Sequence, residues 1–469
     1  MLFNSYEFIF VFLPIIFFGY FFLIKHYPNS IAKVWLLAGS LFFYSWWNVI
    51  YLPILLGSII VNFLIGTHLA GLLNVSDYRK KLTLFSGLAF NLLLLGYFKY
   101  ADFFINSVNL SIGANFNLLN LTLPLGISFF TFQQITFLVD SYNGKIQKYN
   151  FLSFAVFVSF FPQLIAGPIV HHKEMMPQFQ NQKNFHINYQ NIGKGLFLFS
   201  VGLFKKVAIA DFFAKWATPG FDIAKTLTFL EAWATSISYT FQIYFDFSGY
   251  TDMAIGVALL FNIKLPINFN SPYGARNIQE FWRRWHMTLT RFLRDYIYIP
   301  LGGNRQKGFR VEGNLMVTFL IGGLWHGGNI TFLSWGFLHG LAMIVFRFWK
   351  AFNIKMNFFF SWLVTFVFVN TTWVLFRAET WTDAVKVLQA MWGGSGFNLT
   401  VFEFFPNIHP GLYCCLVILT LIFAAVGKSS NYYMNNFQFN KKMLAFFVIL
   451  FGVGIINIES NMEFLYFAF

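Results

Sequence analysis

Charged side chains and cysteines are both scarce in this chain. Only 11% of its 469 residues are Asp, Glu, Lys or Arg, whereas a soluble globular protein carries about 25%. So few charges cannot cover a water-exposed surface of normal size, which excludes an ordinary soluble domain. The two cysteines, Cys414 and Cys415, are adjacent in an apolar run, so they predict no disulfide framework.

Apolar residues are abundant instead, at 57% of the chain, and they cluster in long runs. Because an apolar helix of roughly 20 residues crosses a bilayer core, the runs predict an all-α protein with roughly eleven transmembrane helices plus re-entrant or surface helices. Their continuous Phe- and Leu-rich composition favours helices over the alternating strands of a membrane barrel. The candidates lie near residues 3–24, 34–50, 51–73, 82–100, 123–140, 151–170, 192–213, 229–246, 250–263, 314–324, 329–349, 361–376, 411–427 and 442–458.

The basic residues near the N-terminus predict its orientation. No basic segment precedes the first apolar run, so we expect no cleaved signal peptide. Lys25 and Lys33 follow that run, which places its end in the cytoplasm and Met1 outside. The basic cluster at 79–81 then lies inside after two more spans. Beyond Val170 the charges are too dispersed to orient the spans.

The net charge is strongly positive, at +14 from 32 Lys and Arg against 18 Asp and Glu. A basic soluble protein would suggest a nucleic acid partner. In a membrane protein the simpler interpretation is cytoplasmic charge that meets anionic lipid, with some share for an anionic substrate. We therefore predict no nucleic acid partner.

One polar interruption, residues 276–297, combines aromatic and basic side chains in the sequence RNIQEFWRRWHMTLTRFLRDYI. Helical periodicity separates them into two faces and predicts one amphipathic helix that lies on the membrane surface or caps a cavity. The arginines suit phosphate groups; an equally supported alternative is a lipid anchor with His286 in the core. The apolar face carries Trp282, Trp285, His286, Leu289, Phe292, Leu293, Tyr296 and Ile297, and the basic face carries Arg283, Arg284, Arg291, Arg294 and Asp295.

His326 is isolated in a run without charged residues, 314–346, within the sequence GGLWHGG. A titratable side chain in such surroundings predicts a functional site. The four flanking glycines let another backbone or a ligand come close, and imidazole suits proton transfer near neutral pH. The alternative is a structural histidine that bonds a neighbouring carbonyl. His339 would point about 220° away on a continuous helix, so a structural role is predicted for it.

Two carboxylates, Asp246 and Asp252, lie in the apolar sequence YFDFSGYTD. Buried carboxylates need partners, and these two could orient a base or bind a proton. A structural role in bonding Tyr or Arg on nearby helices is equally supported. The adjacent pair His171 and His172 lacks a second ligand pair at useful spacing, so no metal site is predicted. No G-x-S-x-G sequence supports a serine nucleophile.

Six segments together resemble the membrane-bound O-acyltransferase family, in its bacterial branch of alginate and peptidoglycan O-acetylation membrane subunits. They follow the family order and show no departure at the motif positions, whereas the tail after about residue 380 carries no recognised motif. We expect residues 1–469 to form a single transmembrane domain with a motif-bearing core at about 123–378. The segments are LPLGISFFTFQ (123–133), FFPQLIAGPIV (160–170), YFDFSGYTDMAIG (244–256), NSPYGARNIQEFWRRWHMTLTRFLRDYIYIPLGGNR (270–305), GGLWHGG (322–328) and TTWVLFRA (371–378).

The resemblance implies acyl transfer across a membrane. Family members share a helical core hollowed from both sides, so we expect a central tunnel in which a cytosolic thioester, acetyl-CoA, meets an extracytoplasmic hydroxyl. His326 of the WHG motif would be catalytic, and His286 of the RRWH motif would be the second, less universal histidine. No permanently bound cofactor is expected. The residues expected to bind substrate are Arg283, Arg284, Arg291, Trp282, Trp285, Asp246, Asp252 and Trp325.

The resemblance also implies a bacterial inner-membrane location, membrane lipids as surroundings and a periplasmic acetyltransferase partner. The many Asn, Ile, Lys and Phe residues indicate an AT-rich genome, which favours peptidoglycan over alginate as the extracytoplasmic glycan. Teichoic acid, cellulose or a protein would leave the motifs unchanged. A transporter of acyl or glycan substrates is the alternative from another class, but no inverted repeat supports it.

Overall fold

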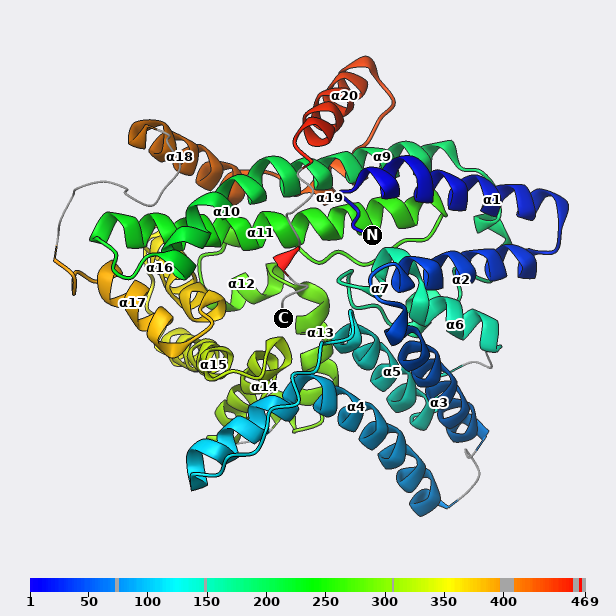
Figure 1. Cartoon of the computed structure of the whole chain (residues 1–469), viewed down its shortest axis with the longest axis horizontal. Coiled ribbons are helices and arrows are strands. Elements are labelled where there is room, and N and C mark those ends of the chain that lie inside the picture. Colours follow the sequence, from blue (N-terminus) through cyan, green and yellow to red (C-terminus); the bar gives the residue numbers. More distant parts are fainter. Residues whose placement is uncertain (72–75, 147–149, 306–307, 397–408, 459–463, 466–469) are drawn as a thin grey trace. The chain divides into compact units, whose positions relative to one another are not determined.

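The computed structural model describes residues 1–71, 76–146, 150–305, 308–396, 409–458 and 464–465. Throughout this described part the regular elements are helices and no strand occurs (Figure 1). The prediction of an all-α protein is therefore confirmed.

The chain divides into two compact units. The first contains Met1–Val201 and Tyr250–Pro266, and the second contains Gly202–Gly249 and Ile267–Phe469. The helices of the first unit are α1 (Leu13–His26), α2 (Asn29–Ser45), α3 (Leu52–Gly71), α4 (Asp77–Ile112), α5 (Ile127–Tyr142), α6 (Phe151–Ser159), α7 (Phe161–Leu164), α8 (His172–Met175) and most of α9 (Tyr189–Phe204).

Buried amides join three helices of the first unit. Asn62 of α3 donates hydrogen bonds to Asn91 of α4 (3.2 Å) and to Gln134 of α5 (2.9 Å). Asn91 donates in return to Asn62 at 2.6 Å, and Ser58 donates to Gln134 at 2.6 Å. Because polar groups without partners are costly in an apolar surrounding, this reciprocal network holds α3, α4 and α5 in one register.

The second unit carries the sequence motifs around His286 and His326. Helix α11 (Phe229–Leu260) passes from this unit into the first. The remaining elements are η4 (Lys205–Ala210), α10 (Asp211–Thr218), η5 (Pro219–Ile223), η6 (Pro272–Gly274), α12 (Ile278–Arg284), α13 (Met287–Leu293), η7 (Arg294–Tyr298), η8 (Gly303–Arg305), α14 (Arg310–His326), α15 (Ile330–Ala351), α16 (Phe358–Arg377), α17 (Trp381–Met391), α18 (Pro410–Val426), α19 (Ser430–Asn435) and α20 (Lys441–Ile456).

Helices α14 and α15 pack at very close range. A Cβ atom added at Gly323 would lie 2.4 Å from the carbonyl oxygen of Phe332, and one added at Gly336 would lie 2.5 Å from that of Phe319. Only glycine fits at such backbone-to-backbone contacts. Of the glycines beside His326, Gly323 therefore allows the approach of another backbone, which is that of α15, whereas Gly322 and Gly327 face the side chains of Leu293 and Phe332.

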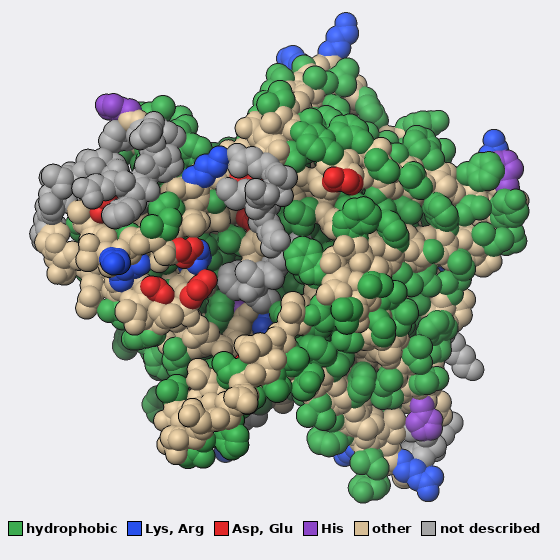
Figure 2. Space-filling model, in the orientation of Figure 1, with side chains coloured by type: hydrophobic (Ala, Val, Ile, Leu, Met, Phe, Trp, Pro, Cys, Tyr) green, Lys and Arg blue, Asp and Glu red, His purple; other side chains and the backbone are tan. Residues whose placement is uncertain are grey.

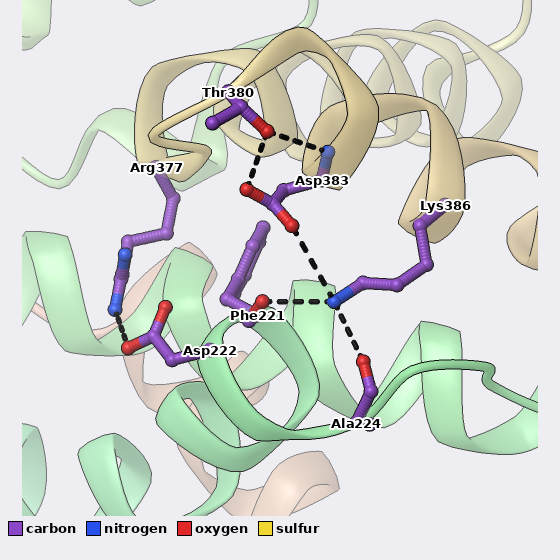
Figure 3. Close-up of polar contacts among 7 residues, drawn as sticks. All are labelled: Phe221, Asp222, Ala224, Arg377, Thr380, Asp383 and Lys386. Atoms are coloured by element: carbon purple, nitrogen blue, oxygen red, sulfur yellow. Dashed lines mark hydrogen bonds and ion pairs between the residues drawn. The ribbon is translucent and has the colours of Figure 1, made fainter.

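The C-terminal end of α16 contacts η5 through polar side chains (Figure 3). Arg377 forms an ion pair with Asp222, and its guanidinium lies 5.3 Å from the ring centroid of Phe221. Lys386 of α17 donates hydrogen bonds to the carbonyls of Phe221 (2.9 Å) and Ala224 (2.8 Å). Charge-assisted bonds of this kind are among the stronger polar contacts in proteins. They hold the end of α16 in place just beside the functional site described below.

Five helical segments are long and apolar enough to cross a membrane, within the described ranges. They are Phe8–His26, Val49–Gly71, Asp77–Ile112, Ile330–Ala351 and Phe358–Arg377. Large apolar side chains such as Phe18 and Leu93 are 70% and 72% exposed, and on the face shown in Figure 2 hydrophobic side chains are widely exposed while charges are sparse. The protein is a multi-pass membrane protein, and the count of roughly eleven spans stays a prediction.

Candidate active site

The segment 276–297 is broken in the middle, so the prediction of one continuous amphipathic helix is wrong. Helix α12 ends at Arg284 and α13 begins at Met287. Between them His286 adopts a left-handed backbone conformation with φ of +42°. A non-glycine residue in this region is uncommon, and such residues cluster at functional sites.

Asn268 holds this break open by long-range hydrogen bonds. Its backbone carbonyl accepts from the N–H of Met287 at 2.9 Å. Its side-chain Oδ1 accepts from the backbone N–H of Thr288 at 3.2 Å and from the Thr288 hydroxyl at 2.9 Å. Because a backbone N–H can only donate, the atom it contacts is the amide oxygen. The side chain of Asn268 therefore has a defined orientation.

The same oxygen defines the protonation of His286. The distance from His286 Nδ1 to Asn268 Oδ1 is 3.1 Å, and since the oxygen only accepts, Nδ1 carries the proton. The side chain is fully buried, and burial lowers the pKa of His286 to about 3. His286 is therefore a neutral imidazole with Nε2 as its acceptor nitrogen.

His326 ends α14 and lies among aromatic rings. The centroid of its imidazole is 4.8 Å from the ring of Trp325, 5.3 Å from Trp335 on α15 and 4.8 Å from Phe376 on α16. Only 3% of the residue is exposed. The rings of His286 and His326 lie 6.4 Å apart, so the two histidines proposed from separate motifs are neighbours.

A cavity of about 490 Å³ opens beside His326. Its lining follows α14 from Leu315 to His326, a rise of about 16 Å along the helix. It also follows α15 from Trp335 to Lys350, in the opposite direction, and α12, α13 and η7 complete the wall. The cavity thus connects His326 with the opposite end of the α14–α15 pair.

That opposite end is rich in cations. Arg347 and Lys350 line the cavity there, and Arg283 and Arg294 line it from α12 and η7. Arg347 pairs with Glu312 at 3.0 Å and Arg294 with Asp295 at 2.7 Å. No described carboxylate pairs with Arg283 or Lys350. The cavity therefore keeps an excess of positive charge, which favours an anionic ligand.

Of the residues expected to bind substrate, Trp282 and Arg283 line the cavity and Arg284 and Arg291 do not. Arg284 pairs instead with Glu280 at 2.6 Å. The predicted basic face is thus divided. The division does not follow the turn at His286, since Arg283 before it and Arg294 after it both line the cavity. On α12 itself the adjacent side chains of Arg283 and Arg284 point about 100° apart, so only one of the two faces the cavity.

The other two expected tryptophans pack behind the cavity. Trp325 lies beside both histidines, with its ring 5.8 Å from that of His286 and 4.8 Å from that of His326. Trp285 contacts the ring of Trp373 at 4.9 Å. Both are buried, and of the two only Trp325 has described ring contacts with the imidazoles.

The two expected carboxylates lie elsewhere. Asp246 is buried in an ion pair with Lys206 at 2.8 Å, and Lys206 also pairs with Asp211 at 2.7 Å. Asp246 is not among the residues that line the cavity. Asp252 belongs to the first unit, where it is also buried. Among the described residues no group of three His, Cys, Asp or Glu is arranged to hold a metal ion.

His339 is close to the site, contrary to the angular argument from a continuous helix. The chain reverses at residues 327–329 between α14 and α15, where Asn329 caps α15 by accepting from the N–H of Thr331. Trp282 Nε1 donates to His339 Nδ1 at 3.2 Å, and His339 Nε2 lies 3.0 Å from the hydroxyl of Thr372. His339 thus positions a tryptophan that lines the cavity. The Gly-Gly-Asn sequence after His326 was the available signal for the reversal.

Sequence reasoning did not select Asn268, Arg294, Arg347 and Lys350 as site residues. A basic residue near the end of an apolar run, such as Arg347 or Lys350, commonly marks only a helix end at the membrane surface. Asn268 lies in a loop without periodicity. Arg294 did fall on the predicted basic face, but no local pattern separates Asn268, Arg347 and Lys350 from ordinary interfacial and loop residues.

Several known proteins are similar to this chain over half of its length or more. Residues 41–379 match the profile of the membrane-bound O-acyltransferase family. A peptidoglycan O-acetyltransferase of Helicobacter pylori is 47% identical over 100% of this chain and 98% of its own length. A probable alginate O-acetylase of Pseudomonas aeruginosa is 39% identical over 85% of this chain and 76% of its own. A teichoic acid D-alanyltransferase of Bacillus subtilis is 27% identical over 52% and 63%.

The family profile therefore covers the buried histidine pair, the break at His286 and the glycine contact of α14 with α15. The relatives extend the match over the full chain. These findings confirm the resemblance carried by the six sequence segments: the chain belongs to the membrane-bound O-acyltransferase family.

Proposed function

We propose that this protein is an acetyl-CoA-dependent O-acetyltransferase of a bacterial inner membrane, which supplies acetyl groups for peptidoglycan. The observation that carries the chemistry is a cavity with a buried imidazole, His326, at one end and an excess of cations over described carboxylates at the other. Support for the acceptor is the similarity to the Helicobacter pylori peptidoglycan O-acetyltransferase over nearly the full length of both chains.

In the proposed reaction His326 acts as general base. Its neutral imidazole takes the proton of an incoming hydroxyl, whose oxygen attacks the acetyl carbonyl. The C–S bond then breaks, and the CoA thiolate leaves and receives the proton back from His326. A well-placed general base contributes about 10²–10⁴-fold to rate, and holding both reactants in one cavity contributes further by orientation.

His286 has a different proposed part. Its Nδ1 proton is committed to Asn268, so it cannot exchange that proton without breaking the bond that holds the turn. Its acceptor Nε2, a neighbour of the His326 ring, suits a positioning role toward the hydroxyl. We therefore expect substitution of His286 to be milder than substitution of His326.

The cationic end of the cavity is the proposed binding site of the CoA phosphates. Arg283 and Lys350 lack described carboxylate partners, and Arg294 and Arg347 add to the local charge. The rise of about 16 Å from Leu315 to His326 suits the extended pantetheine arm of the donor. Arginine forks and lysine are both fitted to phosphate oxygens.

This end is also the proposed cytosolic side. The connections that meet there hold Arg305 and Lys355, whereas the short connections at the His326 end, 327–329 and 378–380, contain no Lys or Arg. The positive-inside rule then places the donor mouth in the cytosol. The acceptor would approach from the other side, either as the glycan itself or as a periplasmic acetyltransferase partner.

The decisive experiment combines the purified protein with the cell wall of its host. Purified protein and labelled acetyl-CoA should show acetyl transfer or slow thioester hydrolysis, which a transporter would not catalyse. Deletion of the gene should then remove O-acetyl groups from muropeptides. Intact muropeptide acetylation together with loss of acetyl from alginate or another surface glycan would contradict the peptidoglycan assignment and retain the acetyltransferase chemistry.

A further inference from the structure

A second hollow lies on the other side of α15, between α15 and α16. Its volume is about 810 Å³, and both helices are long and apolar enough to cross a membrane. Leu341 and Val345 of α15 and Val364 of α16 line it, and they are 41%, 55% and 57% exposed. The hollow is therefore an apolar groove that is open to the side, as expected of a surface that faces lipid.

One end of the groove is cationic. Arg276, Lys350 and Lys355 line it there, and none of the described lining residues is acidic. No described carboxylate forms an ion pair with any of these three side chains. The guanidinium of Arg276 lies 4.8 Å from the ring of Phe358, which holds it at the groove. The positive charge at this end is therefore available to an anion.

The length of the groove matches one leaflet of a membrane. From Leu338 to Lys350 the lining of α15 rises by about 18 Å, and half of a hydrocarbon core is about 15 Å. Trp349 lies at the cationic end, where its indole donates to the carbonyl of Ile354 at 2.9 Å. Tryptophan at this depth is typical of the membrane–water interface.

We propose that this groove binds an anionic phospholipid. The phosphate lies against Arg276 and Lys355, and one acyl chain extends along α15 toward Leu338. Charge complementarity decides the orientation, because cations occur at one end only and the remainder of the described lining is uncharged and mostly apolar. Basic pockets between transmembrane helices bind such headgroups by this combination of charge and apolar contact.

The lipid would share a wall with the cavity of His326. Phe346 and Lys350 line both the groove and the cavity. A bound lipid phosphate would therefore compete with the CoA phosphates for the Lys350 ammonium, or help to orient it. This effect on the donor rests on the proposed function, whereas the proposal of lipid binding does not. The binding experiment accordingly uses no measurement of activity.

The test is native mass spectrometry of the full-length protein in detergent, titrated with phosphatidylglycerol or with phosphatidylcholine of the same acyl chains. We expect phosphatidylglycerol to be retained in preference. The double variant Arg276→Gln/Lys355→Gln should bind it about 10- to 30-fold more weakly, since each removed cation contributes about 1 kcal/mol. The matched control Lys441→Gln/Lys442→Gln removes two exposed cations at the start of α20 and should bind like the wild type.

A second variant separates a lipid from a free anion. Ala342→Phe places a ring in the apolar part of the groove and should weaken the binding of phosphatidylglycerol. In the wild type, added inorganic phosphate should not displace bound phosphatidylglycerol. Unchanged binding in this variant, or displacement of the lipid by millimolar phosphate, would show an anion site only and overturn the proposal. Equal binding of the two lipids by the wild type would overturn the proposal without any variant. The groove would then be a packing surface for another apolar helix.

Discussion

The imidazole rings of His286 and His326 lie 6.4 Å apart although the two residues belong to different motifs. Their surroundings differ in a way that predicts different roles. His286 donates its Nδ1 proton to Asn268, whereas His326 lines a cavity with a cationic far end. The first is suited to hold a substrate in place, and the second to exchange a proton with it.

Replacement of His326 tests the central chemical step. In His326→Ala and His326→Gln we expect acetyl transfer to fall by at least about 10²-fold, because the general base is lost. Binding of acetyl-CoA, measured separately by calorimetry, should remain near that of the wild type. Near-normal turnover in either variant would remove His326 from the mechanism, and joint loss of binding and turnover would assign it a structural role.

Asn268 is predicted to act through His286. Asn268→Ala removes the acceptor for three donors, so kcat should fall about tenfold and the Tm should fall as well, since each buried bond contributes about 1 kcal/mol. Asn268→Asp keeps an acceptor oxygen at the same place and should recover part of kcat. A loss of Tm with unchanged kcat would show that the turn is only structural.

The buried state of His286 predicts a specific acid sensitivity. Burial lowers the pKa of His286 to about 3, whereas an unfolded histidine titrates near 6.5. Above about pH 6.5 both states are neutral. Between 6.5 and 3 only the unfolded chain takes the proton, so the free energy of unfolding decreases by about 1.4 kcal/mol per pH unit as pH falls.

The corresponding variant is His286→Asn, because Asn tolerates the positive φ at this position. Between pH 7 and pH 5 the Tm of this variant should fall less steeply than that of the wild type. Parallel slopes would mean that His286 is protonated in the folded protein or exposed to solvent. Measurement by thermal denaturation in detergent compares the two proteins under the same conditions.

The cationic end of the cavity predicts a change in donor affinity. Arg283→Ala and Lys350→Ala should raise the KM for acetyl-CoA with little change in kcat, and the effect should shrink with added salt. Arg284→Ala is the matched control, because Arg284 is paired with Glu280 and does not line the cavity. An equal rise in KM for Arg284→Ala would indicate a diffuse charge effect and not a phosphate seat.

Membrane orientation can be tested by cysteine labelling after Cys414 and Cys415 are replaced. We expect Ser30→Cys, between the first two spans, to be protected from an impermeant reagent in intact cells. Asn353→Cys, at the proposed donor mouth, should be protected as well, whereas Tyr6→Cys should react. Labelling of position 30 would reverse the predicted orientation of the N-terminal spans, and labelling of position 353 would place the donor mouth outside.

The composition of the chain, and the position of a single titratable residue in a long uncharged run, were sufficient to predict a helical membrane protein and a candidate site residue. With so few charges, the chain had to use lipid as its solvent. Its long continuous apolar runs had to be helices, because the only other structure that satisfies the backbone in a bilayer is a closed barrel of alternating strands. His326 was a candidate because a titratable side chain in a long uncharged run is costly without a function, and the structure places it beside the cavity. Both conclusions depend only on the composition of the chain and on the near neighbours of each residue along it, and these are given by the sequence.

The geometry of the site depended on contacts between residues distant in the chain. Periodicity predicted one helix over 276–297, but hydrogen bonds from Asn268 stabilise a left-handed turn at His286 that no local preference favours. The chain reversal after His326 brought His339 into hydrogen-bond contact with Trp282. It also placed Arg347 and Lys350 in the lining of the His326 cavity, together with Arg283. A helical pattern reports only the neighbours within one or two turns. The assembly of His286, His326 and the cationic end was therefore decided by tertiary packing alone.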